Sequence, residues 1–260
     1  MEIADYEIVR TLGDAGYGVM YTARPPARLA SSDELVGLKV LEVADDEAAL
    51  RRATRELRAF AAVRSPHLVR LLDAGRDGTS FFYAMEYCAR GSLAAPTTEL
   101  GEEEVVRSVR EAALAAHALH EAGLVHRGIK PANVLLHADG GARLADLGLV
   151  QALDPDQLMT GLGSVGSLEY VEPSLLTGHP AARASDVWSL GATLQHALTQ
   201  KPLYDVPSND PLLAVRIVLT QAPRIAEELP EPWAEVVRTC LAPAREDRYA
   251  SALALADALG

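Results

Sequence analysis

The sequence has little cysteine and no long apolar run, and each absence narrows the class of protein. The two cysteines, Cys88 and Cys240, lie far apart and lack the spacing of a metal or redox site. This usage fits a reducing compartment and predicts two ordinary packing residues. No segment approaches the roughly 18 consecutive apolar residues that span a bilayer. The charged opening run, Met1–Arg10, lacks the apolar core of a secretory signal, so we expect a cytoplasmic protein with no membrane partner.

Basic residues are also scarce. The sequence contains 24 Lys and Arg against 36 Asp and Glu, and its formal charge is -12. This sign is opposite to the one that a nucleic-acid backbone attracts, so we expect no nucleic-acid partner. The length of 260 residues and the 49% hydrophobic content are enough to bury a substantial core, and disorder is not expected.

The hydrophobic pattern changes along the chain from strand-like to helical. Before Gly91 the pattern predicts one amphipathic helix, Asp45–Val63, and short strands at Tyr6–Arg10, Val19–Ala23, Leu35–Val40, Leu68–Ala74 and Phe81–Glu86. After Gly91 it predicts a long helix, Glu102–Glu121, a hairpin turn at Asp139–Gly141, and mostly helices from Pro173 onward. The sequence therefore predicts an α+β protein with two lobes.

A glycine-rich segment, Gly13–Gly18, lies between the first two predicted strands. A dinucleotide-binding fingerprint would instead follow a strand and open a helix. A glycine-rich turn lets backbone amides approach phosphate oxygens closely, because no Cβ stands between them. Taken alone the segment is a weak signal, and a plain hairpin turn is an open alternative.

Further short motifs follow this segment in a fixed order. They are Val36–Lys39, Glu56 within a helix, His126–Asn133 (HRGIKPAN), Asp146–Gly148 (DLG), Gly166–Ser174 (GSLEYVEPS) and Asp186–Gly191 (DVWSLG). In this order they resemble the motifs of the eukaryotic-like serine/threonine protein kinases of bacteria, over nearly the whole chain. The resemblance implies the bilobal protein-kinase fold in a single domain, residues 1–260. It places the N-lobe at residues 1–86, the hinge at 87–91 and the C-lobe at 92–260.

The resemblance also implies an ATP site. Lys39 would reach the α- and β-phosphates and would be held by an ion pair with Glu56. Asn133 and Asp146 would hold Mg²⁺, which prefers hard oxygen ligands. The other implied nucleotide-binding residues belong to the glycine loop, the adenine slot, and the hinge with its gatekeeper: Leu12, Gly13, Gly16, Gly18, Met20, Gly37, Met85, Glu86, Cys88 and Leu135.

The catalytic loop departs from the kinase pattern at one position. The motif H-R-D-x-K-x-x-N carries an aspartate that orients the substrate hydroxyl, and this chain has Gly128 in its place. Lys130, which faces the transferred phosphate in the family, is retained. General acid–base catalysis typically contributes about 10²- to 10⁴-fold in rate. We therefore expect a catalytically impaired pseudokinase that binds ATP and acts as a nucleotide-sensitive signalling or scaffold module, with an unidentified protein partner.

Two other functions stay open at this point. One is an enzyme with a non-standard base, either a weakly active serine/threonine kinase or a nucleotidyl transferase that moves AMP. The other is a purely structural module that binds no nucleotide.

Two later motifs concern the support of the catalytic loop. Asp186–Gly191 resembles the helix that anchors this loop from beneath. In Gly166–Ser174 the last residue is Ser174, where the family has a glutamate that pairs with a late arginine, here Arg248. The sequence therefore predicts that the anchor is kept and that the glutamate–arginine clamp is lost.

Overall fold

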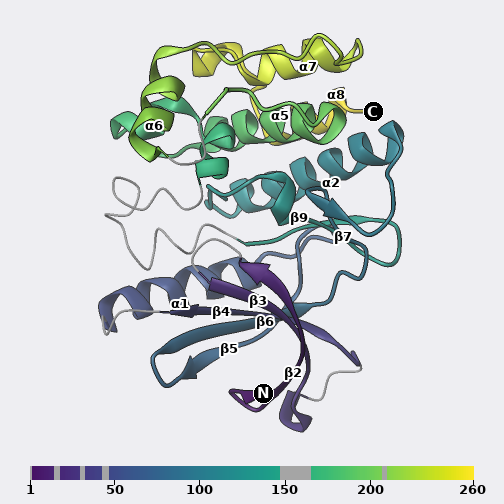
Figure 1. The fold of residues 1–260 in the computed structure, drawn as a ribbon, viewed down its shortest axis with the longest axis vertical. Coiled ribbons are helices and arrows are strands. Elements are labelled where there is room, and N and C mark those ends of the chain that lie inside the picture. The colour runs from purple at the N-terminus through teal and green to yellow at the C-terminus, as the bar shows by residue number, and fades with distance from the viewer. Residues whose placement is uncertain (1, 15–17, 30–32, 43–46, 147–164, 207–209) are drawn as a thin grey trace.

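The computed structural model describes residues 2–14, 18–29, 33–42, 47–146, 165–206 and 210–260. Figure 1 shows a lobe of strands with one long helix at the bottom and a lobe of helices at the top. The N-terminus lies in the first lobe and the C-terminus in the second. The expected two-lobed α+β architecture is therefore confirmed.

The smaller lobe is built on a six-stranded antiparallel sheet with the strand order β1-β2-β3-β4-β6-β5. Its strands are β1 (Glu2–Ile3), β2 (Tyr6–Asp14), β3 (Gly18–Arg24), β4 (Val36–Glu42), β5 (Leu71–Asp77) and β6 (Ser80–Glu86). Successive side chains of a strand point to opposite faces. On β6, Phe82 and Ala84 accordingly belong to an outer apolar cluster, whereas Tyr83 and Met85 belong to the main core. The sheet is therefore buried on both faces.

Helix α1 (Glu47–Ala62) packs alongside this sheet (Figure 1). Its buried residues are Ala49, Ala53, Leu57 and Phe60, a spacing that places them on one helical face. The helix expected at Asp45–Val63 is thus confirmed from Glu47, the first described residue, to Ala62, one residue short of the predicted end.

The segment between α1 and β5 bonds to the other lobe. The strand expected at Leu68–Ala74 begins at Leu71 instead. Leu68 forms an isolated parallel bridge with Leu144, the amide of Val69 donates to the carbonyl of Leu144 over 3.0 Å, and the amide of Leu144 donates to the carbonyl of His67 over 2.8 Å. Because these backbone groups find their partners in the larger lobe, they cannot join the sheet of the smaller one.

A second sheet, with the order β10-β9-β7-β8, lies between the two lobes (Figure 1). Its strands are β7 (Gly91–Ser92), β8 (Ala95–Pro96), β9 (Val134–Leu136) and β10 (Ala142–Leu144). The turn between β9 and β10 contains Gly140 at φ +87°, and the amide of Gly141 donates to the carboxylate of Asp139 over 2.8 Å. The hairpin expected at Asp139–Gly141 is therefore confirmed.

The larger lobe is helical. Within the part that the structure describes, its α-helices are α2 (Glu102–Glu121), α5 (Arg183–Thr199), α6 (Pro211–Thr220), α7 (Trp233–Cys240) and α8 (Ala252–Ala258). Short 3₁₀ segments are η1 (Ala27–Leu29) in the smaller lobe and η2 (Pro131–Asn133), η3 (Val165–Tyr170), η4 (Pro173–Thr177) and η5 (Arg245–Asp247) in the larger one. Within the described residues, none of the helices has both the length and the apolar content needed to cross a membrane.

Helix α5 is the buried centre of the larger lobe, with both α2 and α7 packed against it. Gly191 lies on α5 where a Cβ would overlap the side chain of Cys240 on α7. The glycine of the DVWSLG motif is therefore required for close packing of α5 against α7. This packing holds α5, the helix that carries the motif, in place.

Candidate functional site

The glycine-rich segment joins β2 to β3. Gly13 has φ +131°, a conformation open to glycine, and a Cβ on Gly18 would overlap the carbonyl of Val40 on β4. Leu12 is exposed on β2. Gly16 lies outside the described residues, so its predicted role stays a prediction. Of the described glycines in this segment, Gly13 thus has a backbone conformation that favours glycine, and Gly18 lies where a side chain would overlap β4.

The residues predicted to form the adenine slot come from neighbouring strands. Met20 on β3 pairs with Lys39 on β4, and Gly37 on β4 pairs with Met85 on β6. A Cβ on Gly37 would lie 3.2 Å from Cγ of Met85, which is tight. Leu135, on β9, and Met20 are both partly buried against the main core. The fold therefore places these residues on the strands that the sequence predicts.

The two predicted hinge residues Glu86 and Cys88 differ in their surroundings. The backbone amide of Arg70 donates to Oε1 of Glu86 over 2.8 Å. Cys88 is buried, and desolvation raises the pKa of its thiol to about 12. Cys88 is therefore uncharged at neutral pH, as expected for a packing residue.

Lys39, Asp146 and Tyr83 form a hydrogen-bonded group at the centre of the site. Nζ of Lys39 lies 2.6 Å from Oδ2 of Asp146, and the hydroxyl of Tyr83 donates to Oδ1 of Asp146 over 2.8 Å. Lys39 and Tyr83 are each 1% exposed. Burial alone would raise the pKa of Asp146, but the charge of Lys39 and the hydrogen bonds from Lys39 and Tyr83 outweigh it and lower that pKa. Asp146 is therefore a carboxylate held on both oxygens.

The expected ion pair between Lys39 and Glu56 is wrong for this structure. Among the described residues, Glu56 instead makes its ion pair with Arg127, whose Nη1 lies 3.8 Å from Oε1 of Glu56. The ammonium group of Lys39 already has a closer carboxylate in Asp146. Glu56 and Arg127 side chains are 29% and 35% exposed, so their attraction is reduced by solvent.

Asp186 anchors the catalytic loop, as the DVWSLG motif predicts. Its carboxylate accepts hydrogen bonds from the amides of His126 and Arg127, over 2.8 and 2.9 Å, and lies 2.8 Å from Nε2 of His120. Asp186 is fully buried on α5. Arg127 has φ +65°, a left-handed conformation that costs a residue other than glycine on the order of 1–3 kcal/mol. The carboxylate of Asp186 holds the backbone in this conformation.

The loop around Gly128 keeps its backbone contacts. The side-chain amide of Asn133 donates to the carbonyl of Gly128 over 2.7 Å, and the amide of Gly128 donates to Nδ1 of His126 over 3.2 Å. Burial lowers the pKa of His126, which fits a neutral structural residue. Nζ of Lys130 donates to Oγ of Ser167 over 3.1 Å. Position 128 is thus held in place while it presents no carboxylate.

Asn133 and Asp146 form a donor set of the kind that Mg²⁺ takes. Asn133 uses its Nδ2 group for Gly128, so its amide oxygen is the atom that suits a cation. One amide oxygen and one carboxylate fit a cation that usually keeps several waters and also binds nucleotide phosphates. No group of three or more His, Cys, Asp or Glu side chains suited to a metal ion occurs within the described residues. The residue types therefore fit Mg²⁺ carried with a nucleotide, not a separate protein cage, although at Asp146 the cation competes with the hydrogen bonds of Lys39 and Tyr83.

The predicted loss of the glutamate–arginine clamp is wrong. Glu172, two residues before Ser174, supplies the carboxylate: its Oε1 lies 2.8 Å from Nη1 of Arg248, and its Oε2 lies 2.7 Å from Nη2 of Arg245. Arg245 also donates to Oγ of Ser174 over 3.2 Å, and the hydroxyl of Ser185 donates to Glu172 over 2.7 Å. The clamp is present with its acid moved along the chain.

Sequence reasoning missed the roles of Tyr83 and Glu172. Tyr83 alternates with Phe82 and Ala84 in a buried strand, so its hydroxyl had to meet a polar partner on the face of Met85. Glu172 is an acid in the Gly166–Ser174 motif. Both signals are present in the sequence, but the identity of the partner depends on tertiary structure.

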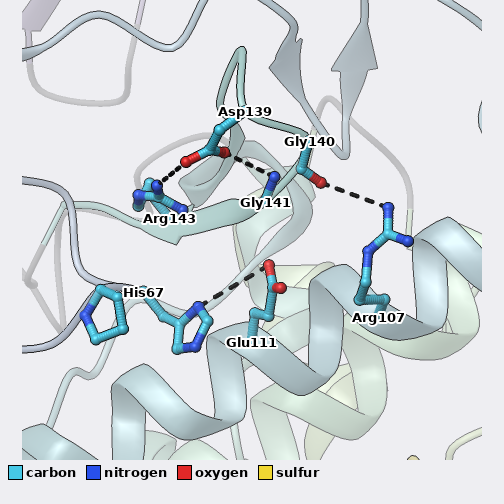
Figure 2. A pocket seen from close by; sticks show the side chains of 8 residues that line it. His67, Arg107, Glu111, Asp139, Gly140, Gly141 and Arg143 are labelled. Atoms are coloured by element: carbon cyan, nitrogen blue, oxygen red, sulfur yellow. Dashed lines mark hydrogen bonds and ion pairs between the residues drawn. The ribbon is translucent and has the colours of Figure 1, made fainter.

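A polar cavity of about 520 Å³ lies behind the hinge, where its lining residue Arg143 pairs in register with Leu135 and lies 3.9 Å from Glu86. Figure 2 shows Asp139 paired with Arg143, and His67 facing Glu111. None of the residues predicted for nucleotide or metal binding lines it. Its lining residues are Pro66, His67, Arg107, Glu111, Asp139, Gly140, Gly141 and Arg143.

Comparison with known proteins agrees with this geometry. The serine/threonine-protein kinase PknK of Mycobacterium tuberculosis is 33% identical over 257 residues, which are 96% of this chain and 23% of PknK. PknL of the same organism is 33% identical over 230 residues, 86% of this chain and 58% of PknL. This chain thus spans well under two thirds of the length of either relative.

The fold also matches a solved structure. The crystal structure of the PknI kinase domain of Mycobacterium tuberculosis matches with a TM-score of 0.73 and 26% identity, over 100% of this chain and 96% of that one. Residues 6–258 match the protein kinase domain family. The chain belongs to the protein kinase family and is similar to bacterial serine/threonine kinases.

Proposed function

We propose that this chain is an ATP-binding pseudokinase, a nucleotide-sensitive signalling or scaffold module with impaired phosphoryl transfer. The observation that carries the proposal is the catalytic loop. Asp186 and Asn133 hold its backbone, whereas Gly128 offers no carboxylate to orient a hydroxyl. An intact frame without its general base favours binding over chemistry.

The nucleotide-binding roles fall to residues that the fold brings together. Lys39 would meet the phosphates, the strands carrying Met20, Gly37 and Met85 would hold the adenine, and Glu86 and Cys88 would border it as the hinge. Asn133 and Asp146 would hold Mg²⁺. When bound, that ion would screen the charge of the phosphates. Lys130 would lie beside the terminal phosphate.

The impairment follows from the missing carboxylate. Phosphoryl transfer depends mainly on positioning and on charge stabilisation, and the family aspartate aligns the incoming hydroxyl. Loss of the general base should lower the rate by about 10²- to 10⁴-fold, whereas ATP affinity does not depend on a general base. Binding and chemistry should therefore separate in this chain.

A thermal-shift titration with ATP tests the binding. A ligand at 100 times its dissociation constant adds about 2.7 kcal/mol of stability, so a clear rise in the midpoint of unfolding is expected. Glu56→Gln is the control variant, because it removes a charge near the site and leaves Lys39 and Asp146 unchanged. It should show a rise similar to that of the wild type. Absence of any shift at millimolar ATP, with and without Mg²⁺, would contradict the proposal.

Product analysis tests the impairment. Incubation with ATP labelled at the α- or γ-position should leave the chain and an added protein substrate essentially unlabelled. Transfer of the γ-label at about 1–100 s⁻¹, the range typical of kinases, would show an active enzyme. Transfer of the α-label would show AMP transfer instead.

We further propose a cytoplasmic location. The two cysteines are free and buried, which fits a reducing compartment. Fractionation of cells that express the tagged full-length protein tests this, and recovery in a membrane or extracellular fraction would contradict it.

A further inference from the structure

We propose that Tyr83 sets the part that Mg²⁺ plays in nucleotide binding: by holding Asp146 on Lys39, it leaves ATP affinity nearly independent of divalent cation. This inference rests on the proposed ATP binding and adds a property of the same site. It is carried by the hydrogen bonds at Asp146 and by the charges around it.

The two donors to Asp146 lie side by side in the smaller lobe. Lys39 on β4 and Tyr83 on β6 are directly paired across the sheet, so their side chains leave the same face side by side. Both reach Asp146, which lies just after β10 in the larger lobe. Two neighbouring donors of one lobe therefore hold a single carboxylate of the other.

A divalent cation would compete with Lys39 and Tyr83 for the carboxylate of Asp146. The ammonium of Lys39 lies 2.6 Å from one oxygen, and the phenol of Tyr83 donates to the other over 2.8 Å. A divalent cation at this carboxylate would have to displace or weaken one of these hydrogen bonds and would lie close to a second positive charge. Hydrogen bonds to charged groups are among the stronger ones, so their loss opposes metal binding.

The missing carboxylate at position 128 also affects the charge of the site. Among the described residues around the catalytic loop, Lys39 pairs with Asp146, Arg127 pairs with Glu56, and Lys130 donates to Ser167 rather than to a carboxylate. An aspartate at position 128 would add a negative charge beside them. Gly128 leaves these cations less neutralised than an aspartate would, which favours phosphate binding without help from a metal ion.

The outer face of the same sheet offers a matched control. There the hydroxyl of Tyr6 donates to Oδ2 of Asp73 over 2.8 Å, and Arg28 donates to the same oxygen over 2.7 Å. This group has the same chemistry, a tyrosine and a cation on one carboxylate, but Tyr6 and Asp73 lie outside the nucleotide-binding residues. Tyr6→Phe therefore removes an equivalent hydroxyl without affecting Asp146.

The test measures the dissociation constant of ATP by calorimetry, in excess Mg²⁺ and in EDTA, for the whole chain. In the wild type and in Tyr6→Phe the two constants should agree within about threefold. In Tyr83→Phe, Mg²⁺ should improve affinity about tenfold or more relative to EDTA, because loss of one hydrogen bond to a charged group frees an oxygen for the cation.

Each outcome decides between the hypotheses. A wild type that binds ATP at least tenfold better with Mg²⁺, or a Tyr83→Phe ratio equal to that of the wild type, overturns this inference and leaves the proposed function standing. Absence of ATP binding by the wild type in both buffers overturns the proposed function as well. If Tyr83→Phe does not fold, a wild-type ratio near one supports the cation independence of binding, and a ratio of tenfold or more still overturns the inference.

Discussion

Glu172 and Arg248 form an ion pair 2.8 Å long in which each side chain is 2% exposed. Arg248 also lies over the ring of Trp188 on α5, with its guanidinium carbon 5.0 Å from the ring centroid. The pair therefore joins the segment after η3 to α5 and to the region before α8. Its position explains why a substitution at Ser174 does not remove the clamp.

Replacement of Glu172 by glutamine should destabilise the protein strongly. Loss of one partner from a buried ion pair leaves a buried charge without compensation and typically costs about 3–5 kcal/mol. Ser174→Ala is the matched control, because it removes one 3.2 Å contact to Arg245 and should cost less than about 1.5 kcal/mol. Urea unfolding of the three proteins measures both values. Equal losses for the two variants would show that the acid was assigned to the wrong residue.

The contribution of Glu172 should also depend on pH. Burial would raise the pKa of its carboxyl, but hydrogen bonds from Arg245, Ser185 and Arg248 outweigh burial and lower the pKa from 4.5 to about 2. A lowered pKa in the folded state gives stability that is fully present above about pH 4.5 and is lost as the pH falls towards 2. The difference in unfolding free energy between the wild type and Glu172→Gln should therefore be constant from pH 7 to 5 and shrink below. A difference that stays constant down to pH 3 would contradict this assignment.

Most of the fold could be predicted from residue patterns. The helix Glu102–Glu121 agrees with its prediction because a complete apolar stripe and Gly123 define it locally. The hairpin around Gly140 follows from turn chemistry in the same way. The strand at Leu71 starts later than predicted because Leu68 and Val69 bond to Leu144, a partner that no local pattern reveals.

The candidate site was less predictable because it depends on partners from distant segments. The motifs identify Lys39 and Asp146, but they do not show that these two side chains bond to each other and leave Glu56 to Arg127. Likewise, an alternating strand shows which way Tyr83 points and not what it meets. Local sequence gives the residue types, and tertiary packing decides the pairs.

Restoring the carboxylate at position 128 should restore phosphoryl transfer. The clamp through Glu172 and the anchor through Asp186 are both present, so the frame that an aspartate needs is in place. Gly128→Asp should raise γ-phosphate transfer to a protein substrate by about 10²-fold or more, the range of general acid–base catalysis. Gly128→Asn is the control, since it adds similar volume without a base. No gain from Gly128→Asp would show that the active site is altered beyond this position.

Lys39 and Glu56 should differ in their importance for ATP. Lys39→Met removes the buried cation that would meet the phosphates and should weaken ATP binding more than about tenfold, the scale of one charged hydrogen bond. Glu56→Gln should change it less than about threefold, because Glu56 pairs at 3.8 Å with Arg127 and a solvent-screened pair contributes about 0–1 kcal/mol. Calorimetric titration with ATP measures both constants. A large effect of Glu56→Gln would indicate that Lys39 turns to Glu56 when nucleotide binds.

Asp186→Asn should loosen the catalytic loop without replacing its residues. The carboxylate accepts from two consecutive amides, those of His126 and Arg127, and an asparagine offers one oxygen and turns an NH₂ group towards the other amide. Hydrogen bonds to a charged group contribute about 1.5–3 kcal/mol each, so we expect a loss of about 3 kcal/mol or more in unfolding free energy. Amide hydrogen exchange should accelerate at His126 and Arg127, since the strained φ of Arg127 then lacks its support.

Asp139→Asn, at a half-exposed carboxylate in the β9–β10 turn, is the control and should leave exchange at the amides of His126 and Arg127 unchanged. Unchanged protection of His126 and Arg127 in Asp186→Asn would mean that the loop is held by its other contacts, the bond of Asn133 to the carbonyl of Gly128 and the 3.1 Å contact of His126 Nε2 with the carbonyl of Ala145.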